Sequence, residues 1–430
     1  MSSGTAERVD LVAYRDVRDA LYDRSLSRAF DKRTFAEGNH RAGVLSTQHG
    51  QDHKLRRRLE NPLFSRQRLF EYERDLFPAV LERLLERLLD TGSRDLFRLG
   101  MQLSVVLAAR RAGIDHDESP QDLSTLARHA ETIAQGAAIL DIVGDKEAVR
   151  RRVTETQAEL DSRYVSPSRR RREGLLDSVA RGERPAEAVP DDVLTRMLQH
   201  RHHPAYDFDD GVILREVATF LHGGTHTSAQ TLVNTFDLLF SYFQGQPSAR
   251  DRLESDRTFV QRCVHETLRL RPTTPRIKRL AEADTVVGDQ RIERGTTVVL
   301  DVASANRDAS LFGPSPETFN PDRRVDDEVA RWGLSFGAGP HICIGRAVAG
   351  GFPLAPDGDP RAEDGGHLSG LVAVMVQQVA RAGAQPDPAG RQEVDDRTDR
   401  GTRWRHYDVR FEGRRDWLSP VPRTDRSRDA

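Results

Sequence analysis

The segment FGAGPHICIGR, residues 336–346, surrounds a single cysteine, Cys343, with glycines on both sides. Glycine carries no Cβ, so the backbone of such a loop can approach a flat ligand closely. Its amide hydrogens also remain free to point at the sulfur. Two interpretations follow: Cys343 is a metal ligand in a cofactor loop, or it is a buried structural thiol in a glycine-rich turn. The number of glycines around one sulfur favours the first.

Cysteine usage, charge and hydropathy limit the class of protein. Cys263 and Cys343 are the only cysteines, too few for a disulfide framework and consistent with a reducing compartment. The 65 Lys and Arg residues nearly balance the 67 Asp and Glu residues, so no strong basic field exists to attract nucleic acid. No stretch approaches the roughly 18 to 20 consecutive apolar residues that cross a bilayer, and the first residues lack the pattern of a signal peptide. We expect a cytoplasmic protein without a nucleic-acid or membrane partner.

Hydrophobic periodicity predicts a mainly helical protein. Apolar residues recur at intervals of three and four from Leu76 to Leu89, which indicates an amphipathic helix. Residues 212–243 are apolar on several faces and predict a long buried helix, interrupted by the polar run HGGTHTS at 222–228. Short β-rich runs at 285–287 and 296–300 flank turn signals and predict a small sheet with a hairpin. The predicted fold class is mainly α with a minor β part.

The cysteine loop resembles the heme-binding segment of the cytochrome P-450 family, which has the pattern F-x-x-G-x-x-x-C-x-G. The resemblance implies that Cys343 is the proximal metal ligand of a heme b, and that Phe336, Gly337 and Gly345 belong to the cofactor loop. A metal-bound thiolate is deprotonated and donates electron density to the iron, which favours O–O cleavage. The family's fold is a triangular, helix-rich domain with small β-sheets. Cys263, by contrast, is expected to be an inert core residue on a helix.

A second family feature is the E-x-x-R pair of Glu266 and Arg269, whose spacing puts both side chains on one helix face. Alone, such a pair would be interpreted as a solvated salt bridge worth under about 1 kcal/mol. Its position, about seventy to eighty residues before Cys343, matches the family, as does the later segment FNPDR at 319–323. The resemblance implies that Arg323 completes the pair and that all three side chains have a structural role in fixing the heme loop.

Basic side chains elsewhere match the family's contacts to the heme propionates. His53 and Arg57 lie in an H-x-x-x-R-R pattern, and the resemblance implies charge-assisted bonds from both to the propionates. Arg279 stands where the family places another propionate-binding arginine, and His341 in the cysteine loop would be the fourth contact. The run ANRD at 305–308 also matches a bacterial signature of the family.

The polar run on the long helix departs from the family, which has Ala/Gly-Gly-x-Asp/Glu-Thr-Thr there. Thr227 keeps the alcohol and Gly224 the groove for dioxygen, but His226 replaces the acid. Imidazole can relay protons near neutral pH because its unperturbed pKa is about 6.5, so Thr227 and His226 are the predicted catalytic residues. His222 and His226 also have the i, i+4 spacing of a zinc pair, but the glutamate of the hydrolytic motif is absent. Zinc is therefore the lesser alternative.

We expect one heme-thiolate domain over residues 1–430, with two departures from the family. The helix of His53 starts tens of residues earlier than usual, so the first helix and strand are expected to be abbreviated or missing. Beyond Gly345, a Pro/Gly/Asp-rich stretch predicts an insertion near 350–367, before helix resumes at about 368–382. Its place close to the proximal face would alter docking of a redox partner.

Electrons are expected to come from a separate protein, because one heme domain uses the length of the chain and no set of cysteines could hold an iron–sulfur cluster. An acidic ferredoxin would be attracted by a basic proximal surface. The residues expected to form that surface are Arg56, Arg58, Arg66 and Arg346.

Substrate-contacting loops are expected at Phe30–Gln48 and Ser162–Ala205, and the run Arg169–Arg172 is expected to be a solvated loop. The polar character of these segments favours a polar or carrier-bound small molecule. The leading hypothesis is hydroxylation of such a molecule in specialised metabolism, with O2 and ferredoxin-borne electrons. Two alternatives stay open. One is atypical chemistry, such as peroxide use, oxidative coupling or rearrangement, because His226 replaces the acid; the other is a non-catalytic heme protein that recruits a partner.

Overall fold

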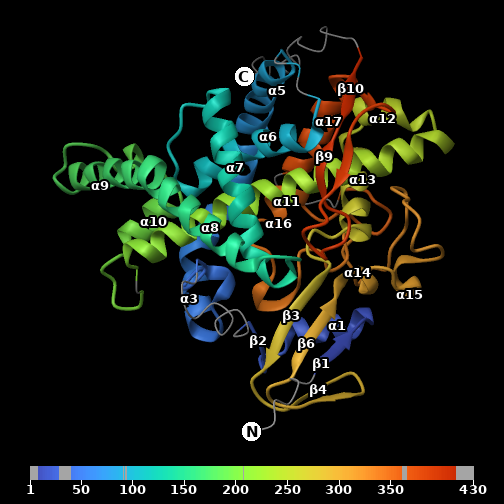
Figure 1. The fold of residues 1–430 in the computed structure, drawn as a ribbon, viewed down its shortest axis with the longest axis horizontal. Helices are drawn as coiled ribbons and strands as arrows, with labels where there is room; N and C mark the ends of the chain where they lie inside the picture. The colour runs from blue at the N-terminus through green and yellow to red at the C-terminus, as the bar shows by residue number, and fades with distance from the viewer. Residues whose placement is uncertain are drawn as a thin grey trace, which may run out of the picture.

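Helix α11, Asp210–Gly245, runs through the centre of the molecule, and the other helices surround it (Figure 1). The computed structural model describes residues 8–28, 40–90, 92, 94–206, 208–360 and 366–412. The other helices are α1 (Tyr14–Tyr22), α3 (Gly50–Glu60), α4 (Arg66–Phe70), α5 (Phe77–Asp90), α6 (Leu96–Ala112), α7 (Pro120–Ala137), α8 (Lys146–Leu160), α9 (Ser166–Ala180), α10 (Val193–Gln199), α12 (Ala249–Ser255), α13 (Arg257–Leu270), α14 (Val302–Ala305), α15 (Ala309–Phe312), α16 (Arg346–Gly350) and α17 (Leu371–Arg381). The predicted helices at 76–89 and 212–243 are confirmed as α5 and α11.

The strands form small sheets beside the helices, and the largest has four strands in the order β1-β6-β3-β2. β1 pairs in parallel with β6, and β3 pairs antiparallel with both β6 and β2, so the sheet joins the start of the described chain to its last third. The strands are β1 (Arg8–Leu11), β2 (Leu26–Ser27), β3 (Arg276–Ala281), β4 (Thr285–Val287), β5 (Gln290–Ile292), β6 (Thr297–Asp301), β7 (Ala384–Pro386), β8 (Gln392–Val394), β9 (Trp404–Tyr407) and β10 (Val409–Phe411).

Small residues let α6 and α11 approach closely at the centre of the core. A Cβ on Gly100 of α6 would lie 3.0 Å from Leu232 and 3.2 Å from the backbone of Ala229, both on α11. A Cβ on Gly224 of α11 would lie 3.1 Å from Ala108 of α6. The glycines therefore set the spacing of these two buried helices, which holds the polar run of α11 in a fixed place.

Three sequence-based expectations for the strands and loops need correction or refinement. The predicted hairpin is formed by β4 and β5, but the run at 296–300 belongs to β6 in the four-stranded sheet. The run Arg169–Arg172 is helical, not a loop, since it lies in α9. Arg172 is buried there and pairs with Asp192 at 2.8 Å. The segment Ser162–Ala205 is likewise mostly helical, and part of Phe30–Gln48 lies outside the described residues.

The predicted insertion is a closed excursion between α16 and α17. The Gln261 side chain of α13 donates hydrogen bonds to the Gly350 carbonyl at one end, at 3.0 Å, and to the Leu368 carbonyl at the other, at 3.3 Å. Glu73 accepts bonds from the Ser369 and Gly370 amides, each at 2.7 Å. The two ends of the excursion thus lie side by side; residues 361–365 within it are outside the described part.

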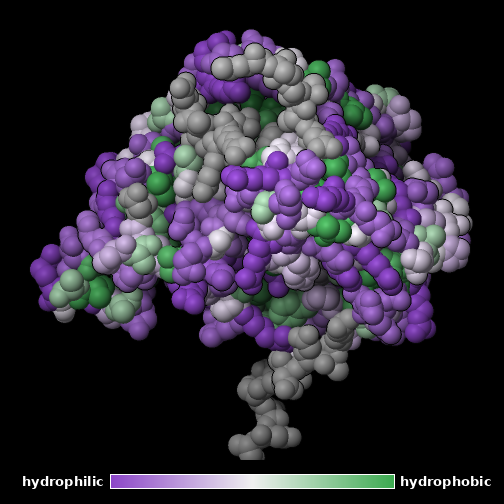
Figure 2. All heavy atoms as spheres, turned by 90° about the horizontal axis from the view of Figure 1, so that it is seen from below, coloured by the Kyte–Doolittle hydropathy of each residue, from purple (hydrophilic) through white to green (hydrophobic). Residues whose placement is uncertain are grey.

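The surface is dominated by polar side chains on the face drawn in Figure 2, where hydrophobic residues occur in small separate groups. None of the helices that the structure describes is long and apolar enough to cross a membrane.

Candidate active site

The cysteine loop holds Cys343 by backbone contacts and leaves its side chain exposed. The Cys343 amide donates to the Phe336 carbonyl at 2.8 Å, and the Gly345 amide donates to the sulfur. The Cys343 residue is exposed, yet protein surrounds its thiol closely enough that burial raises the pKa of the thiol. This combination is typical of a residue at the floor of a concavity. Cys263, in contrast, is fully buried on α13, and burial raises its pKa well above the ordinary value.

Neighbouring residues fix the position of this loop. Phe336 contacts Trp332 edge to face, with ring centroids 5.3 Å apart. Gly339 has φ +65°, and a Cβ there would lie 2.7 Å from the Leu21 carbonyl of α1. Only glycine fits such a position. The loop is therefore seated on α1 as well as on the segment that precedes it.

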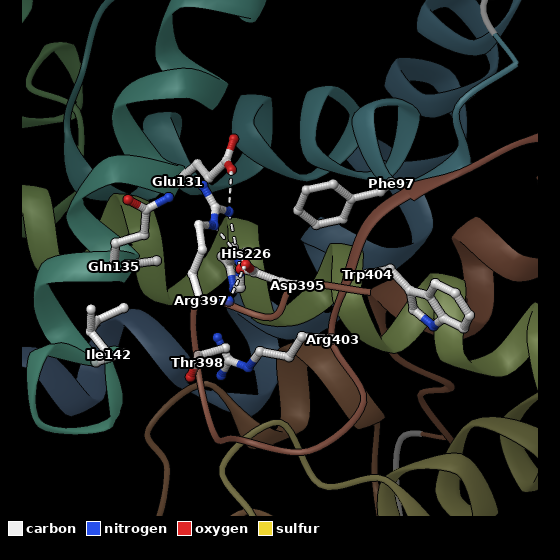
Figure 3. Close-up of a pocket in the computed structure, with 12 residues that line it drawn as sticks. Phe97, Glu131, Gln135, Ile142, His226, Asp395, Arg397, Thr398, Arg403 and Trp404 are labelled. Atoms are coloured by element: carbon white, nitrogen blue, oxygen red, sulfur yellow. Dashed lines mark hydrogen bonds and ion pairs between the residues drawn. The ribbon is translucent and has the colours of Figure 1, made fainter. Parts of the chain in front are cut away.

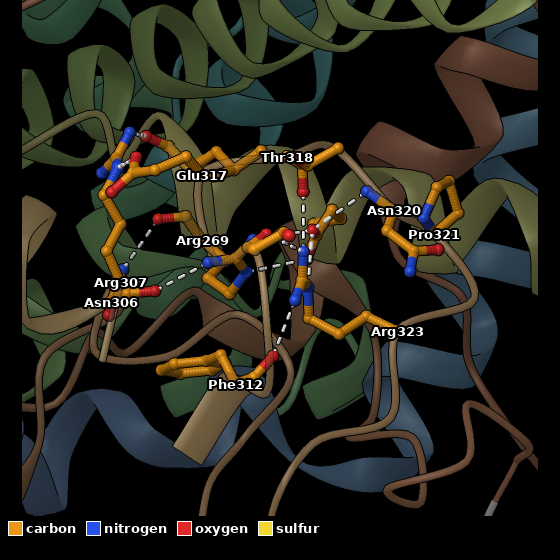
Figure 4. Close-up of polar contacts among 12 residues, drawn as sticks. Arg269, Asn306, Arg307, Phe312, Glu317, Thr318, Asn320, Pro321 and Arg323 are labelled. Carbon is orange, nitrogen blue, oxygen red and sulfur yellow. Dashed lines mark hydrogen bonds and ion pairs between the residues drawn. The ribbon is translucent and has the colours of Figure 1, made fainter. Parts of the chain in front are cut away.

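Glu266 is buried and forms ion pairs with Arg269 and Arg323. Figure 4 shows the two arginines and their polar contacts. Arg269 donates to both carboxylate oxygens of Glu266, at 2.8 and 2.7 Å, and Arg323 donates to one of them at 3.0 Å. The remaining donors of Arg323 reach backbone carbonyls, including that of Phe312 at 2.7 Å and that of Thr318 at 2.7 Å. The structure thus brings together the three residues that the sequence pattern singled out.

Asn306, from the ANRD run, links this network to the cysteine loop. Its side chain donates to the Arg269 carbonyl at 3.1 Å and to the Ser335 hydroxyl at 2.9 Å, and it accepts from the Leu334 amide at 2.7 Å. Ser335 directly precedes Phe336. The motif was noted from the sequence, but the linking role of Asn306 was not predicted.

Histidines and arginines from four segments converge on one side of the cysteine loop. The rings of His53 and His341 have centroids 4.1 Å apart. Burial, the His53 ring and the arginines Arg28 and Arg279 lower the pKa of His341. Arg57 lies near Cys343, and each influences the pKa of the other. Of these residues, sequence reasoning missed Arg28, which follows β2 and carries no motif.

This donor set fits a heme. Three arginines and two imidazoles beside an exposed thiol match two propionates and an iron ligand. A Cβ added to Gly345 would meet nothing within 4 Å, so the backbone beside the sulfur is open. His53, Arg57, Arg279 and His341 could hold the propionates, and Cys343 could bind the iron.

The polar run of α11 is partly open although the helix is central. Gly223 and Gly224 are exposed, and a Cβ on Gly223 would meet nothing within 4 Å. The Thr227 hydroxyl donates to the Gly223 carbonyl at 2.7 Å. Gly224 also packs closely against Ala108, so a side chain at this position would crowd α6. Thr227 therefore presents a hydroxyl whose oxygen can still accept a bond on an accessible stretch of the helix.

His226 is buried and faces a small cavity between α7, α11 and residues 395–404 (Figure 3). Its ring contacts Phe97 edge to face, at 5.8 Å between centroids. Burial and the nearby Arg403 lower its pKa well below the usual value. This lowered pKa favours the neutral imidazole, and the proton relay through His226 stays a prediction. Among the described residues, no group of three His, Cys, Asp or Glu could hold a metal, so the zinc alternative gains no support.

Of the four arginines expected to form a basic surface, Arg56 does not. Arg56 is buried and forms an ion pair with Glu216 of α11. Its guanidinium carbon lies 4.4 Å from the centre of the Phe208 ring. The Arg66 guanidinium lies 4.6 Å from the Phe352 ring in the insertion. Arg58 is exposed, and Arg346 is half-buried.

Comparison with known proteins places these features in one family. A family model described as Cytochrome P450 matches residues 141–350. The chain is 28% identical over 343 residues to cyclooctat-9-en-7-ol 5-monooxygenase of Streptomyces melanosporofaciens, covering 74% of this chain and 71% of the relative. It is 27% identical over 346 residues to pulcherriminic acid synthase of Bacillus subtilis strain 168, covering 78% of each.

Solved structures share the fold. The crystal structure of CalO2 superposes with a TM-score of 0.71 at 21% identity, covering 94% of this chain and 90% of the other. P450BioI, solved in complex with a hexadec-9Z-enoic acid ligated acyl carrier protein, superposes with a TM-score of 0.70 at 16% identity, covering 94% and 92%. Fold and site define a heme-thiolate oxidoreductase. The family model, the relatives and the solved structures together support a bacterial cytochrome P450 monooxygenase with a heme cofactor.

Proposed function

We propose that this chain hydroxylates a small organic molecule, free or carrier-bound, with O2 and electrons from a separate ferredoxin-type protein. The observation that carries the proposal is the placement of Cys343, whose exposed sulfur lies beside the cluster of His53, His341 and Arg57. When bound, the heme supplies the oxidative chemistry. The protein holds the heme, orients it and handles protons.

Each of these tasks has residues placed for it. Cys343 would bind the iron, and the Gly345 amide hydrogen-bonds the sulfur, which tunes the electron density that the thiolate gives. The basic cluster would bind the propionates through charge-assisted bonds. The Thr227 hydroxyl donates its proton to the Gly223 carbonyl, so its oxygen would be available to accept a hydrogen bond from a proton-bearing group on the accessible stretch of α11.

A second candidate is atypical chemistry, such as peroxide use, oxidative coupling or rearrangement. The supporting observation is that the residue before Thr227 is a histidine and not an acid. Burial lowers the pKa of His226 well below its usual value, and the side chain faces the cavity lined by residues 395–404. The acid–alcohol pair that would ordinarily supply protons therefore lacks its acid.

The proposed electron donor is an acidic ferredoxin. Arg58 is exposed and Arg346 is half-buried near the cysteine loop, and a basic surface attracts an acidic partner. Turnover with ferredoxin should therefore fall as ionic strength rises. Rates that ignore salt would remove the support for this partner. A carrier-bound substrate is supported only by the likeness to P450BioI, which was solved with an acyl carrier protein.

The first experiment is the absorption spectrum of the reduced, CO-bound protein. Thiolate ligation requires a red-shifted Soret band, and Cys343→Ser should abolish it. Cys263→Ala is the matched control, since it removes the other sulfur, which is buried in the core. An unshifted band in the wild type, or a band that stays red-shifted in Cys343→Ser, would refute Cys343 as the thiolate ligand.

The second experiment separates the candidate functions by comparing product formation with NAD(P)H, reductase and ferredoxin against product formation with peroxide alone. Hydroxylation needs the first system, whereas atypical chemistry would favour the second. His226→Asp should raise the ferredoxin-driven rate if the missing acid limits turnover. Absence of product with either electron source, with no further change in Thr227→Ala, would indicate the non-catalytic alternative.

A further inference from the structure

A small cavity lies where α7, α11 and the segment between β8 and β9 meet (Figure 3). Its volume is about 20 Å³, the space of one or two water-sized atoms. The polar side chains that line it include Glu131, His226, Asp395, Thr398 and Arg403. The cavity therefore adjoins the part of α11 that carries Thr227, next to His226 in the chain.

Two buried polar atoms on the wall of this cavity lack a partner. Arg403 is 8% exposed, and its Nη2 donates to the Thr273 carbonyl at 2.6 Å. Its Nε has no hydrogen-bond partner within the described chain, and neither has the Thr398 hydroxyl. A guanidinium nitrogen can only donate, so an acceptor is required. Leaving such groups unsatisfied is costly, which indicates that a ligand supplies the acceptor.

The carboxylates around the cavity form ion pairs with basic side chains, but one basic side chain has no such pair. Asp395 pairs with Arg397 at 2.6 Å, and Glu131 lies 3.7 Å from the same guanidinium. The other nearby carboxylate, that of Asp141, is shared by two cations. Those are Lys278 at 2.8 Å and Arg400 at 2.6 Å.

Arg403 is the cation that remains. It has no carboxylate within the 4.0 Å of an ion pair among the described residues. Burial and the charge of Arg400 lower the pKa of Arg403 to about 9, so it is still charged at neutral pH. A buried charge without a partner is far more costly than a buried dipole. An anion would relieve that cost better than water.

We propose that this cavity binds the carboxylate, or an equivalent small anionic group, of the substrate. One oxygen would accept from Arg403 Nε and the other from the Thr398 hydroxyl, which fits the two-atom size of the cavity. The inference rests on the proposed function, because it names the class of molecule that is oxidised: an organic acid anchored beside His226. Arg403 and Thr398 then determine specificity for that acid.

The first test measures occupancy of the cavity in the heme-loaded protein. Acetate at about 100 mM should raise the melting temperature by about 3 °C for a Kd of about 1 mM, whereas acetamide and chloride at equal ionic strength should not. Arg403→Gln and Thr398→Val should lose the acetate effect. Arg405→Gln is the matched control, since Arg405 is exposed and pairs with Glu393 at 3.1 Å on the neighbouring hairpin. Thr398→Val keeps the test usable if Arg403→Gln does not fold.

A second test distinguishes a substrate group from a free anion. Octanoate should shift the heme Soret band at a concentration at least about tenfold lower than octanamide does, and Arg403→Gln or Thr398→Val should remove that difference. Equal binding of acid and amide, no binding of either, or equal loss in Arg405→Gln would overturn the proposal. Acetate stabilisation without octanoate selectivity would overturn the substrate assignment. Failure of the heme-thiolate function is recognised separately, by the absence of the shifted CO-bound band in the same samples.

Discussion

Arg323 and Glu266 are 57 positions apart in the chain, yet the Arg323 Nε donates a buried hydrogen bond of 3.0 Å to Glu266 Oε1. The same oxygen accepts from Arg269 Nη2 at 2.7 Å. One carboxylate thus joins α13 to the segment before the cysteine loop. Because the Asn306 side chain continues the network to Ser335, this contact bears directly on where Cys343 lies.

The first prediction is that Arg323→Met destabilises the protein by about 3–5 kcal/mol, because it leaves the Glu266 carboxylate buried between fewer donors. Arg324→Met is the matched control, since Arg324 is the next residue and is exposed. Urea unfolding of both variants measures the free energy, and the CO-bound spectrum of each reports the heme site. Equal stability of the two variants would show that the network does not hold the loop.

Part of this site could be predicted from the sequence because its residues occur in short motifs with fixed spacing. The i, i+3 spacing of Glu266 and Arg269 puts them on one helix face, and glycines around Cys343 mark the loop. The long helix α11 also follows from its apolar pattern. The resemblance to the family then supplied Arg323, which no local pattern connects to Glu266.

Other features could not be predicted because they depend on tertiary packing. The burial of Arg56 beside Glu216 follows from α3 meeting α11, which no spacing in the sequence encodes. Burial lowers the pKa of His226, and Arg403, a residue far along the chain, lowers it further. Helix in the run Arg169–Arg172 was missed because its charges resemble a solvated loop, whereas Asp192 neutralises Arg172 in the fold.

A second prediction concerns Glu60, which is fully buried at the end of α3. Burial and the neighbouring Glu216 raise its pKa well above the usual value, although Arg56 and Arg57 oppose this. Neither oxygen of Glu60 has a hydrogen-bond partner within the described residues. The folded protein therefore binds this proton more tightly than the unfolded chain, whose glutamate titrates near pH 4.3. Stability is lost as pH rises above that value toward the raised pKa.

Glu60→Gln should remove this loss, since the amide cannot ionise. Its unfolding free energy should match the wild type near pH 4 and exceed it increasingly toward pH 8. Glu155→Gln, at an exposed position of α8, should leave the pH dependence unchanged. The measurement is urea denaturation at each pH. A Glu60→Gln curve parallel to the wild type across this range would contradict the buried, protonated carboxyl.

A third prediction separates the hydroxyl of Thr227 from its neighbours on α11. Thr227→Ala should release more peroxide per NAD(P)H consumed, because the hydroxyl oxygen that would accept a hydrogen bond and hold a proton-bearing group on the accessible stretch of the helix is lost. Thr231→Ala removes a hydroxyl that donates to the Thr227 carbonyl at 2.8 Å but leaves the Thr227 side chain in place. It should keep the wild-type ratio of product to peroxide. The assay is the stoichiometry of NAD(P)H, product and peroxide, and equal uncoupling by both changes would argue against a specific role for Thr227.

The last prediction tests whether the ends of the inserted excursion must touch. Gly370 and Gly366 both have left-handed backbone, with φ +87° and +94°, so alanine is strained at either position. Their surroundings differ. A Cβ on Gly370 would lie 2.3 Å from the Gly351 nitrogen and 2.6 Å from the Ala349 carbonyl, both backbone atoms that cannot move without breaking α16.

A Cβ on Gly366 would instead meet the end of the Arg74 side chain at 3.0 Å, which can rotate away. Gly366→Ala should therefore cost only the backbone strain of about 1–2 kcal/mol, whereas Gly370→Ala should cost several kcal/mol more or prevent folding. Thermal unfolding of the two variants gives the comparison. Similar melting temperatures would mean that α16 and α17 are not locked together. In that case the excursion could move relative to Cys343, whose loop leads directly into α16.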